Sequence, residues 1–287
     1  MREAMFYTHE GNKIRCQLCP RECLLSEGKK GFCRSREVIN GSLIATAYGK
    51  TTSLTLDPIE KKPLYHFHPG SMIVSLGPNS CNLTCKYCQN WEISQQEFPT
   101  RYLAIEDLIQ IIREQRNQQV AFTYTEPLMW YEYILDFAAQ APDIDIVLVT
   151  NAYINQEPWR NILKVVKAVN IDIKSYRDDF YRELCGGKLE VIKDNIIIAK
   201  EIGVHIELTN LLIPGYNDTE EELRDLAMFV ASVDKNIPLH ISAYRPSYKM
   251  TVRATTGEEV ENACEIASRY LNYVYAGNVY SARFSKR

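Results

Sequence analysis

The chain of 287 residues lacks several features that would assign it to a specialised class of protein. No apolar run approaches the roughly 20 residues that a membrane-spanning helix needs. Residues 1–7 carry no apolar stretch typical of a secretory signal, so we expect a cytoplasmic protein. Internal repeats are also absent. A net charge of −3 gives no excess of one sign, so neither nucleic acid nor an anionic membrane is expected as a partner.

The composition is otherwise that of an ordinary globular protein, with 46% hydrophobic and 24% charged residues. The chain has nine cysteines, an odd number, so we expect free thiols or metal ligands rather than disulfides. The length allows one large domain with a small appendage. We therefore divide the chain into an N-terminal cysteine-rich module that includes a short strand pair, residues 1–70, and a larger domain, residues 71–287.

The most informative motif is a cysteine triplet, Cys81, Cys85 and Cys88, spaced C-x3-C-x2-C. A [4Fe–4S] cluster normally takes four thiolates, so three leave one iron open to a small ligand. A structural zinc site and three unrelated thiols are the alternatives. Zinc usually takes four ligands, and this loop holds no histidine and no fourth cysteine. The spacing therefore predicts a cluster with an open iron, and the segment closely resembles the cluster loop of radical S-adenosylmethionine (SAM) enzymes.

Short apolar runs alternate with amphipathic stretches from about Met72 onward. We expect the apolar runs to be buried strands of a parallel sheet: Met72–Leu76, Val120–Tyr124, Ile144–Thr150, Asn170–Ile173, Val204–Leu212 and Leu239–Ser242. The stretches of helical period are Ile105–Gln115, Leu128–Gln140, Pro158–Val169, Val191–Ile202, Glu220–Ser232 and Glu258–Tyr270. Earlier in the chain, Ser42–Tyr48 and Thr51–Leu56 are predicted to pair with each other. Repeated β-α units fit a doubly wound sheet or a barrel. The resemblance selects an α/β fold with a partial (β/α)6 barrel.

Polar residues follow the predicted strands, where parallel α/β folds place their chemistry. The resemblance implies that Glu126, in Tyr-Thr-Glu-Pro, receives the ammonium group of SAM, although Tyr and Thr replace the two glycines of the usual segment. It also implies that Asn151 donates to the carboxylate or ribose of SAM. Both residues have simpler explanations, since Glu-Pro can start a helix and Asn is common in turns.

Asp172 and Lys174 alternate with apolar residues and so point to one side of the fourth predicted strand. The resemblance implies that this Asp-x-Lys pair contacts SAM, as in enzymes that activate glycyl-radical proteins. A surface salt bridge is the alternative. Tyr87, next to the last cysteine of the triplet, is a candidate to lie against adenine.

Weaker candidates lie further along the chain. Leu211–Gly215 either packs on adenine or belongs to the core. The sixth strand brings candidate substrate contacts, although a lone histidine in a strand is more often a core residue. These candidates are His240, Tyr244 and Arg245. We expect Cys185 and Cys264 to be ordinary small apolar residues.

A second group of cysteines lies near the N-terminus. Cys16, Cys19, Cys23 and Cys33 follow the spacing C-x2-C-x3-C-x9-C within a short segment of low apolar content. A segment with so small an apolar core needs a cross-link to fold stably, and either zinc or a second iron–sulfur cluster bound by the four cysteines would provide it. Zinc is the simpler reading, because nothing in the sequence requires electron transfer.

The chain as a whole resembles the AmmeMemoRadiSam system radical SAM enzyme family, related to pyruvate formate-lyase activating enzyme. The resemblance rests on the segments Cys16–Cys23, Asp57–Phe67, Cys81–Ser94, Tyr124–Pro127, Asn170–Lys174, Leu212–Gly215 and Val274–Asn278. One departure is Ala152, where the family usually has glycine.

This resemblance implies an enzyme that uses a [4Fe–4S] cluster to cleave SAM reductively. The resulting 5′-deoxyadenosyl radical would abstract hydrogen from a substrate that the sequence does not identify. It also implies an external electron donor, and Memo-like and AMMECR-like proteins as partners. The alternatives are an activase for a glycyl-radical protein and a non-catalytic zinc-binding adaptor.

Overall fold

The computed structural model describes residues 1–115 and 118–285, which are organised around one large sheet. Its strands are β6 (Lys50–Pro58), β7 (Met72–Pro78), β8 (Arg101–Tyr102), β9 (Gln119–Phe122), β10 (Asp145–Thr150), β11 (Ala168–Asp172), β12 (His205–Leu212), β13 (Leu239–Ala243) and β14 (Val274–Gly277). In the described part of the chain these nine strands lie in the order β14-β13-β12-β11-β10-β9-β7-β6-β8. β7 and β9–β14 run parallel, whereas β6 and β8 are antiparallel additions at one edge. The result is a mixed α/β fold with a central parallel sheet.

The six predicted strands are confirmed as β7 and β9–β13, with ends shifted by a few residues. The sheet also contains a further parallel strand, β14, which pairs with β13. It is only four residues long, too short for its apolar character to stand out in the sequence.

Helices connect most of the parallel strands. They are α1 (Trp91–Ser94), α2 (Ile105–Glu114), α3 (Tyr131–Gln140), α4 (Gln156–Ile162), α5 (Asp178–Phe180), α6 (Leu189–Ile202), α7 (Glu220–Asp234) and α8 (Gly257–Ser268), with short turns η1 (Ile59–Lys61), η2 (Pro127–Trp130) and η3 (Tyr181–Cys185, a π-turn). Thr219 caps α7, and Thr256 forms a capping box with Glu259 at the start of α8. None of the helices in the described residues is long and apolar enough to cross a membrane.

One predicted helix is too long. The helix expected over Pro158–Val169 ends at Ile162, and β11 already begins at Ala168. The β-branched residues Val165, Val166 and Val169 lower the preference for helix, and the apolar run continues directly into the buried strand.

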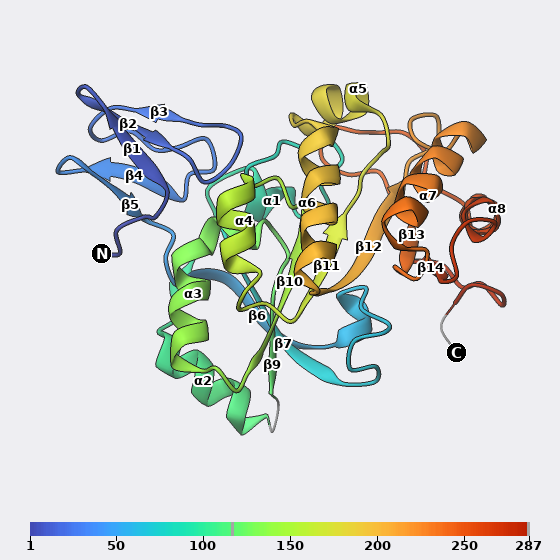
Figure 1. Cartoon of the computed structure of the whole chain (residues 1–287), viewed down its shortest axis with the longest axis horizontal. Coiled ribbons are helices and arrows are strands. Elements are labelled where there is room, and N and C mark those ends of the chain that lie inside the picture. The colour runs from blue at the N-terminus through green and yellow to red at the C-terminus, as the bar shows by residue number, and fades with distance from the viewer. Residues whose placement is uncertain (116–117, 286–287) are drawn as a thin grey trace.

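The first 45 residues form two small sheets at one end of the molecule, drawn in dark blue in Figure 1. One sheet contains β1 (Tyr7–Glu10), β2 (Lys13–Cys16) and β3 (Leu24–Leu25), and the other contains β4 (Arg36–Ile39) and β5 (Ser42–Ala45). The strand pair predicted between Ser42–Tyr48 and Thr51–Leu56 is wrong. β5 pairs with β4, whereas β6 pairs with β7 and β8 in the large sheet, so that residues before 70 already belong to it. The longer apolar partner strand β7 offers more burial than a local hairpin does.

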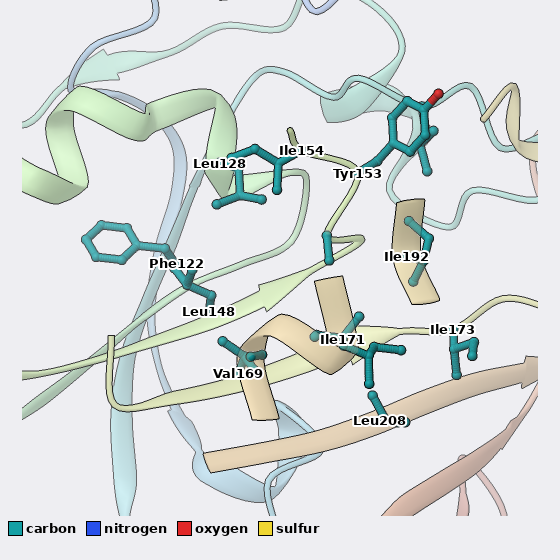
Figure 2. Close-up of a cluster of buried hydrophobic side chains, with 14 of the residues drawn as sticks. Phe122, Leu128, Leu148, Tyr153, Ile154, Val169, Ile171, Ile173, Ile192 and Leu208 are labelled. Atoms are coloured by element: carbon teal, nitrogen blue, oxygen red, sulfur yellow. The ribbon is translucent and has the colours of Figure 1, made fainter. Parts of the chain in front are cut away.

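The main core lies between the parallel strands and the helices that cover them. Figure 2 shows Leu148 of β10, Val169 and Ile171 of β11, Leu208 of β12 and Ile192 of α6 in one cluster of buried hydrophobic side chains. All five side chains are buried. Because this core holds the parallel strands in register, their carboxyl ends form one rigid rim.

Candidate active site

A cavity of about 370 Å³ opens at the carboxyl ends of the parallel strands. Its walls come from the loops that follow β7, β9, β10 and β11, together with a segment between β6 and β7. The structure brings all eight residues predicted for the cluster and for SAM into the lining of this one cavity: Cys81, Cys85, Tyr87, Cys88, Glu126, Asn151, Asp172 and Lys174.

The cysteine triplet lies in the loop between β7 and α1, and a neighbouring turn holds this loop in place. The backbone N–H groups of Thr84 and Lys86 donate to the carbonyl oxygens of Cys185 and Leu184, each at 2.8 Å. The loop is therefore tied to η3 by backbone hydrogen bonds on both sides of Cys85. Such bonds keep three thiols on a short loop in a defined arrangement.

The chemistry of the donor set fits a [4Fe–4S] cluster. Cys81, Cys85 and Cys88 stand on one loop and line the same cavity. Three thiolates would bind three irons of a cluster and leave the fourth open to a ligand. Two thiols also have polar neighbours, since Ser94 Oγ lies 3.2 Å from Cys88 Sγ and Asn151 Nδ2 lies 3.8 Å from Cys81 Sγ. Such contacts tune the reduction potential of iron–sulfur clusters.

Glu126 starts a helical turn, which is the simpler of the two explanations considered from the sequence, and it also lines the cavity. Its side chain caps η2 by accepting from Leu128 N at 3.1 Å, and Pro127 occupies the first position of that turn. Its oxygens also accept from Thr150 Oγ1 at 2.6 Å and from Asn151 N at 2.8 Å. Burial raises the pKa of Glu126 to about 7, although these hydrogen bonds oppose the shift. Glu126 is therefore a buried carboxyl group that lines the cavity.

Asn151 is chiefly an organiser of the cluster loop. Its Nδ2 donates to Asn82 Oδ1 at 3.1 Å, and its Oδ1 accepts from Tyr153 N at 2.8 Å in a turn. The turn interpretation is thus confirmed. Ala152, where the resembled family has glycine, adopts a φ of 50°. This left-handed conformation favours glycine, because a Cβ costs roughly 1 kcal/mol there.

Asp172 and Lys174 form an ion pair at 3.0 Å between Oδ2 and Nζ. The pair lies in the cavity wall, not on the outer surface as the alternative assumed. Burial acts to lower the pKa of Lys174, but Asp172 and neighbouring thiols raise it well above its usual value. Lys174 is therefore a fixed positive charge facing the cavity.

Tyr87 and Cys185 form a buried contact beneath the triplet. Tyr87 Oη lies 3.2 Å from Cys185 Sγ, and Cys85 is a further hydrogen-bond neighbour of Cys185. Cys185 is buried as expected, but it is more than an apolar filler, because it contacts the residues that carry the loop. η3 brings it there, and the sequence spacing carried no signal of that approach. Cys264 is buried in α8, as expected.

Sequence reasoning missed a second charged pair at the cavity mouth. Lys62 Nζ donates to Asp57 Oδ2 at 2.8 Å, and Tyr124 Oη donates to the same oxygen at 2.7 Å. Burial alone would raise the pKa of Asp57, but these donors lower it below its usual range. The run Asp57–Phe67 was a signal of family resemblance, yet nothing in it indicated that Lys62 reaches the cavity.

The placement of this run depends on a buried carboxylate. Glu207 of β12 accepts from the backbone N–H groups of Tyr65 and His66 at 2.9 and 2.7 Å. His240 Nε2 lies 2.6 Å from the same side chain, so the core interpretation of His240 is confirmed. Tyr244 is also buried, and its Oη donates to Met250 O at 3.2 Å. Within the segment Leu211–Gly215, which was expected to pack on adenine or in the core, Leu211 lines the cavity.

The four N-terminal cysteines gather in the small module, outside this cavity. Cys16, Cys19 and Cys33 are buried and Cys23 is half-buried. All nine cysteines of the chain have free thiols. The module packs against the cluster loop, since Ser80 Oγ donates to Cys33 O at 2.6 Å.

The profile of the radical SAM superfamily matches residues 77–230. Uncharacterized protein MJ0808 of Methanocaldococcus jannaschii is 43% identical over 288 residues, covering 97% of this chain and 86% of that protein. The pyruvate formate-lyase-activating enzyme of Clostridium pasteurianum is 24% identical over 159 residues, covering 53% of this chain and 67% of that enzyme.

Among solved structures, SuiB of Streptococcus suis bound to S-adenosylmethionine aligns with a TM-score of 0.57 at 15% identity, over 70% of this chain and 48% of SuiB. This similarity concerns the fold alone. The superfamily match covers more than half of the chain and includes the cysteine triplet together with Glu126, Asp172 and Lys174. The chain therefore belongs to the radical SAM superfamily of enzymes.

Proposed function

We propose that this enzyme binds a [4Fe–4S] cluster through Cys81, Cys85 and Cys88 and cleaves SAM to initiate a hydrogen abstraction. The observation that carries the proposal is the shared cavity of about 370 Å³, where the three thiols face a buried carboxyl group and an ion pair. When bound, the cluster supplies the electron that cleaves SAM into methionine and a 5′-deoxyadenosyl radical, which takes hydrogen from the substrate.

The residues of this chain would bind and orient SAM. The carboxylate of Glu126, which lines the cavity, would accept from the amino group of SAM, since an anionic acceptor gives a strong charge-assisted hydrogen bond. Asp172 and Lys174 offer an acceptor and a donor within 3.0 Å of each other, which suits hydroxyl and carboxylate groups of SAM. Asn151 would act mainly by holding the loop of Cys81. Tyr87 would support the adenine side of the cavity.

A second candidate is activation of a glycyl-radical protein. It is favoured by the Asp-x-Lys pair in the cavity wall and by similarity to a pyruvate formate-lyase-activating enzyme. Mixing the reconstituted enzyme with SAM and a co-expressed protein that carries a glycyl loop would then produce a glycyl-radical doublet in the EPR spectrum. The non-catalytic zinc adaptor is not retained, because the chain belongs to a superfamily of enzymes.

We further propose membership of the AmmeMemoRadiSam system family, on the strength of the run Asp57–Phe67, which positions Lys62 at the cavity mouth. Memo-like and AMMECR-like proteins are then the partners to test. Radical SAM enzymes also need an external electron donor. Nine free thiols support a reducing, cytoplasmic location.

The decisive experiment compares Cys85→Ala with Cys264→Ala after anaerobic reconstitution. We expect Cys85→Ala to abolish formation of 5′-deoxyadenosine from SAM with dithionite, and Cys264→Ala to leave it nearly unchanged. Both cysteines are buried, so the pair separates a cluster ligand from a packing residue. Equal activity of the two variants would contradict the proposed cluster site. Deuterium transfer from candidate substrates into 5′-deoxyadenosine would identify the substrate.

A further inference from the structure

We propose that Cys185 is a positioning residue for the cluster. Its thiol accepts a hydrogen bond from Tyr87 Oη and donates one to the sulfur of Cys85, and this donation raises the reduction potential of the cluster. The inference rests on the proposed function, because the hydrogen bond acts on a cluster bound at Cys85. It assigns a role to η3, a turn outside the loop that carries the cysteine triplet.

The residues after η3 are shaped for a close approach to that loop. Two glycines follow Cys185, and Gly186 has a φ of 68°, a left-handed conformation that glycine adopts without strain. A Cβ on Gly186 would stand 2.5 Å from Thr84 Oγ1. A Cβ on Gly187 would stand 2.8 Å from Leu83 Cδ2. A larger residue at either position would therefore force η3 or the loop to move.

Two backbone hydrogen bonds hold Cys185 beside Cys85. Thr84 N donates to Cys185 O, and Lys86 N donates to Leu184 O, each at 2.8 Å. These bonds lie on both sides of Cys85 in the sequence, and the two cysteines are side-chain hydrogen-bond neighbours. Turns of the π type are frequent at functional sites, and this one brings a thiol against a predicted cluster ligand.

The thiol of Cys185 depends on protein atoms for its hydrogen bonds. Cys185 is fully buried, and both Tyr87 and Cys85 are less than 9% exposed. Tyr87 Oη lies 3.2 Å from Cys185 Sγ, which is the hydrogen-bond partner that the described residues offer to that hydroxyl. A buried polar group without a partner is costly. The three side chains therefore form a short hydrogen-bonded chain inside the protein, with Cys185 in the middle.

The number of protons fixes the direction of this chain once Cys85 binds iron. A cysteine binds iron as the thiolate, which has no proton and can only accept. Two neighbouring buried thiolates would repel each other, so Cys185 keeps its proton. Both remaining protons are donated only if Tyr87 donates to Cys185 and Cys185 donates to Cys85. The reverse direction would leave the Tyr87 hydroxyl proton without an acceptor.

A donor to a cluster sulfur favours the reduced state of the cluster. Reduction adds negative charge, and a hydrogen bond to a ligand sulfur stabilises that charge. Removing the donor should lower the equilibrium constant for one-electron reduction about tenfold, which corresponds to a reduction potential about 59 mV more negative. Cys185 would thus make the cluster easier for an external electron donor to reduce.

A redox titration of the anaerobically reconstituted full chain, followed by EPR without SAM, tests this role. We expect Cys185→Ala to show the tenfold loss. Cys185→Ser keeps a donor of similar size and should stay at or above the wild-type potential. Cys264→Ala, at another fully buried cysteine, should leave the potential unchanged. A wild-type potential in Cys185→Ala, or equal losses in the Ala and Ser variants, would overturn the inference.

Tyr87→Phe provides a measurement that leaves both cysteines in place. It removes only the hydroxyl at 3.2 Å from Cys185 Sγ, so the thiol loses the donor that polarises it. The equilibrium constant for reduction should fall about twofold. This variant decides the question if Cys185→Ala takes up no iron, and an unchanged potential would then overturn the inference.

The same titration separates this inference from the proposed function. If the wild type binds a [4Fe–4S] cluster but its potential is insensitive to Cys185→Ala and Tyr87→Phe, only the role of Cys185 is wrong. If the reconstituted wild type shows no EPR signal of a reduced [4Fe–4S] cluster, the proposed function fails, and the role of Cys185 fails with it.

Discussion

Thr150 donates from Oγ1 to the carboxyl group of Glu126 at 2.6 Å, and this bond joins the end of β10 to the loop that follows β9. Thr150 is 1% exposed and Glu126 is fully buried. The contact keeps an ionisable group of the cavity wall in one orientation, and it opposes the effect of burial on the pKa of that group. Its consequences can be measured in the protein without cofactors.

Glu126 should make the free energy of unfolding depend on pH. Burial raises its pKa from 4.5 to about 7, so the folded state binds more protons than the unfolded state between these values. This contribution to stability is fully present below pH 4.5 and is lost as the pH rises through about 7. Relative to Glu126→Gln, the wild type should therefore lose about 3 kcal/mol over this range.

Urea unfolding of both proteins at several pH values measures this difference. Thr150→Val provides a directional control, because removing the donor to the carboxyl group should move the midpoint of the loss to higher pH. Parallel pH profiles of the wild type and Glu126→Gln would show that Glu126 has an ordinary pKa.

Lys174 should contribute to SAM affinity through its fixed charge in the cavity wall. Replacing it by Gln removes the ammonium that pairs with Asp172 at 3.0 Å and leaves that carboxylate uncompensated. We expect a loss of about 1.5–3 kcal/mol in the binding free energy of SAM, measured by anaerobic calorimetry. Lys193→Gln removes a comparable pair with Glu190 at 3.1 Å on α6 and should leave the affinity unchanged. If the two variants bind SAM with equal affinity, the Asp172–Lys174 pair is a structural salt bridge and does not contribute to SAM binding.

Gly77 should tolerate no side chain, because it lies where two strands approach closely ahead of the cluster loop. A Cβ at this position would stand 2.1 Å from the carbonyl oxygen of Thr123, a backbone atom that cannot rotate away. Gly77→Ala should lower the free energy of unfolding by about 3 kcal/mol or more. Gly257→Ala is the matched control, since nothing lies within 4 Å of its Cβ at the start of α8. A Gly77→Ala variant with wild-type stability in urea would contradict the close approach of these strands.

Replacing Ala152 by glycine should stabilise the folded protein. Its φ of 50° lies in the left-handed region, so Ala152→Gly removes steric strain and should raise the free energy of unfolding by about 1 kcal/mol. Ala199→Gly, at another buried alanine but within α6, should lower it by about 1 kcal/mol. Thermal or urea unfolding of the two variants measures these opposite signs. A loss of stability in both would show that packing of the Ala152 methyl group outweighs the strain.

Much of the site was predictable because its residues stand next to strand ends in the sequence. Cys81, Glu126, Asn151 and Lys174 each follow an apolar run, and parallel strands bring their carboxyl ends to one edge. Lys62 could not be found this way, since it reaches the cavity from a segment that Glu207 holds by the backbone of Tyr65 and His66. Cys185 was missed for a similar reason, because the π-turn η3 carries it to Cys85.

The amino-acid order alone determined the cysteine triplet and the parallel strands, because thiol spacing within one loop and unbroken β-branched runs are local properties. The tertiary structure decided which strand β6 joins, how Lys62 reaches the cavity, and that Ser80 connects the loop of the cysteine triplet to Cys33. These relationships join residues far apart in the chain. They depend on competition among many possible burial partners, which no single stretch of sequence can settle.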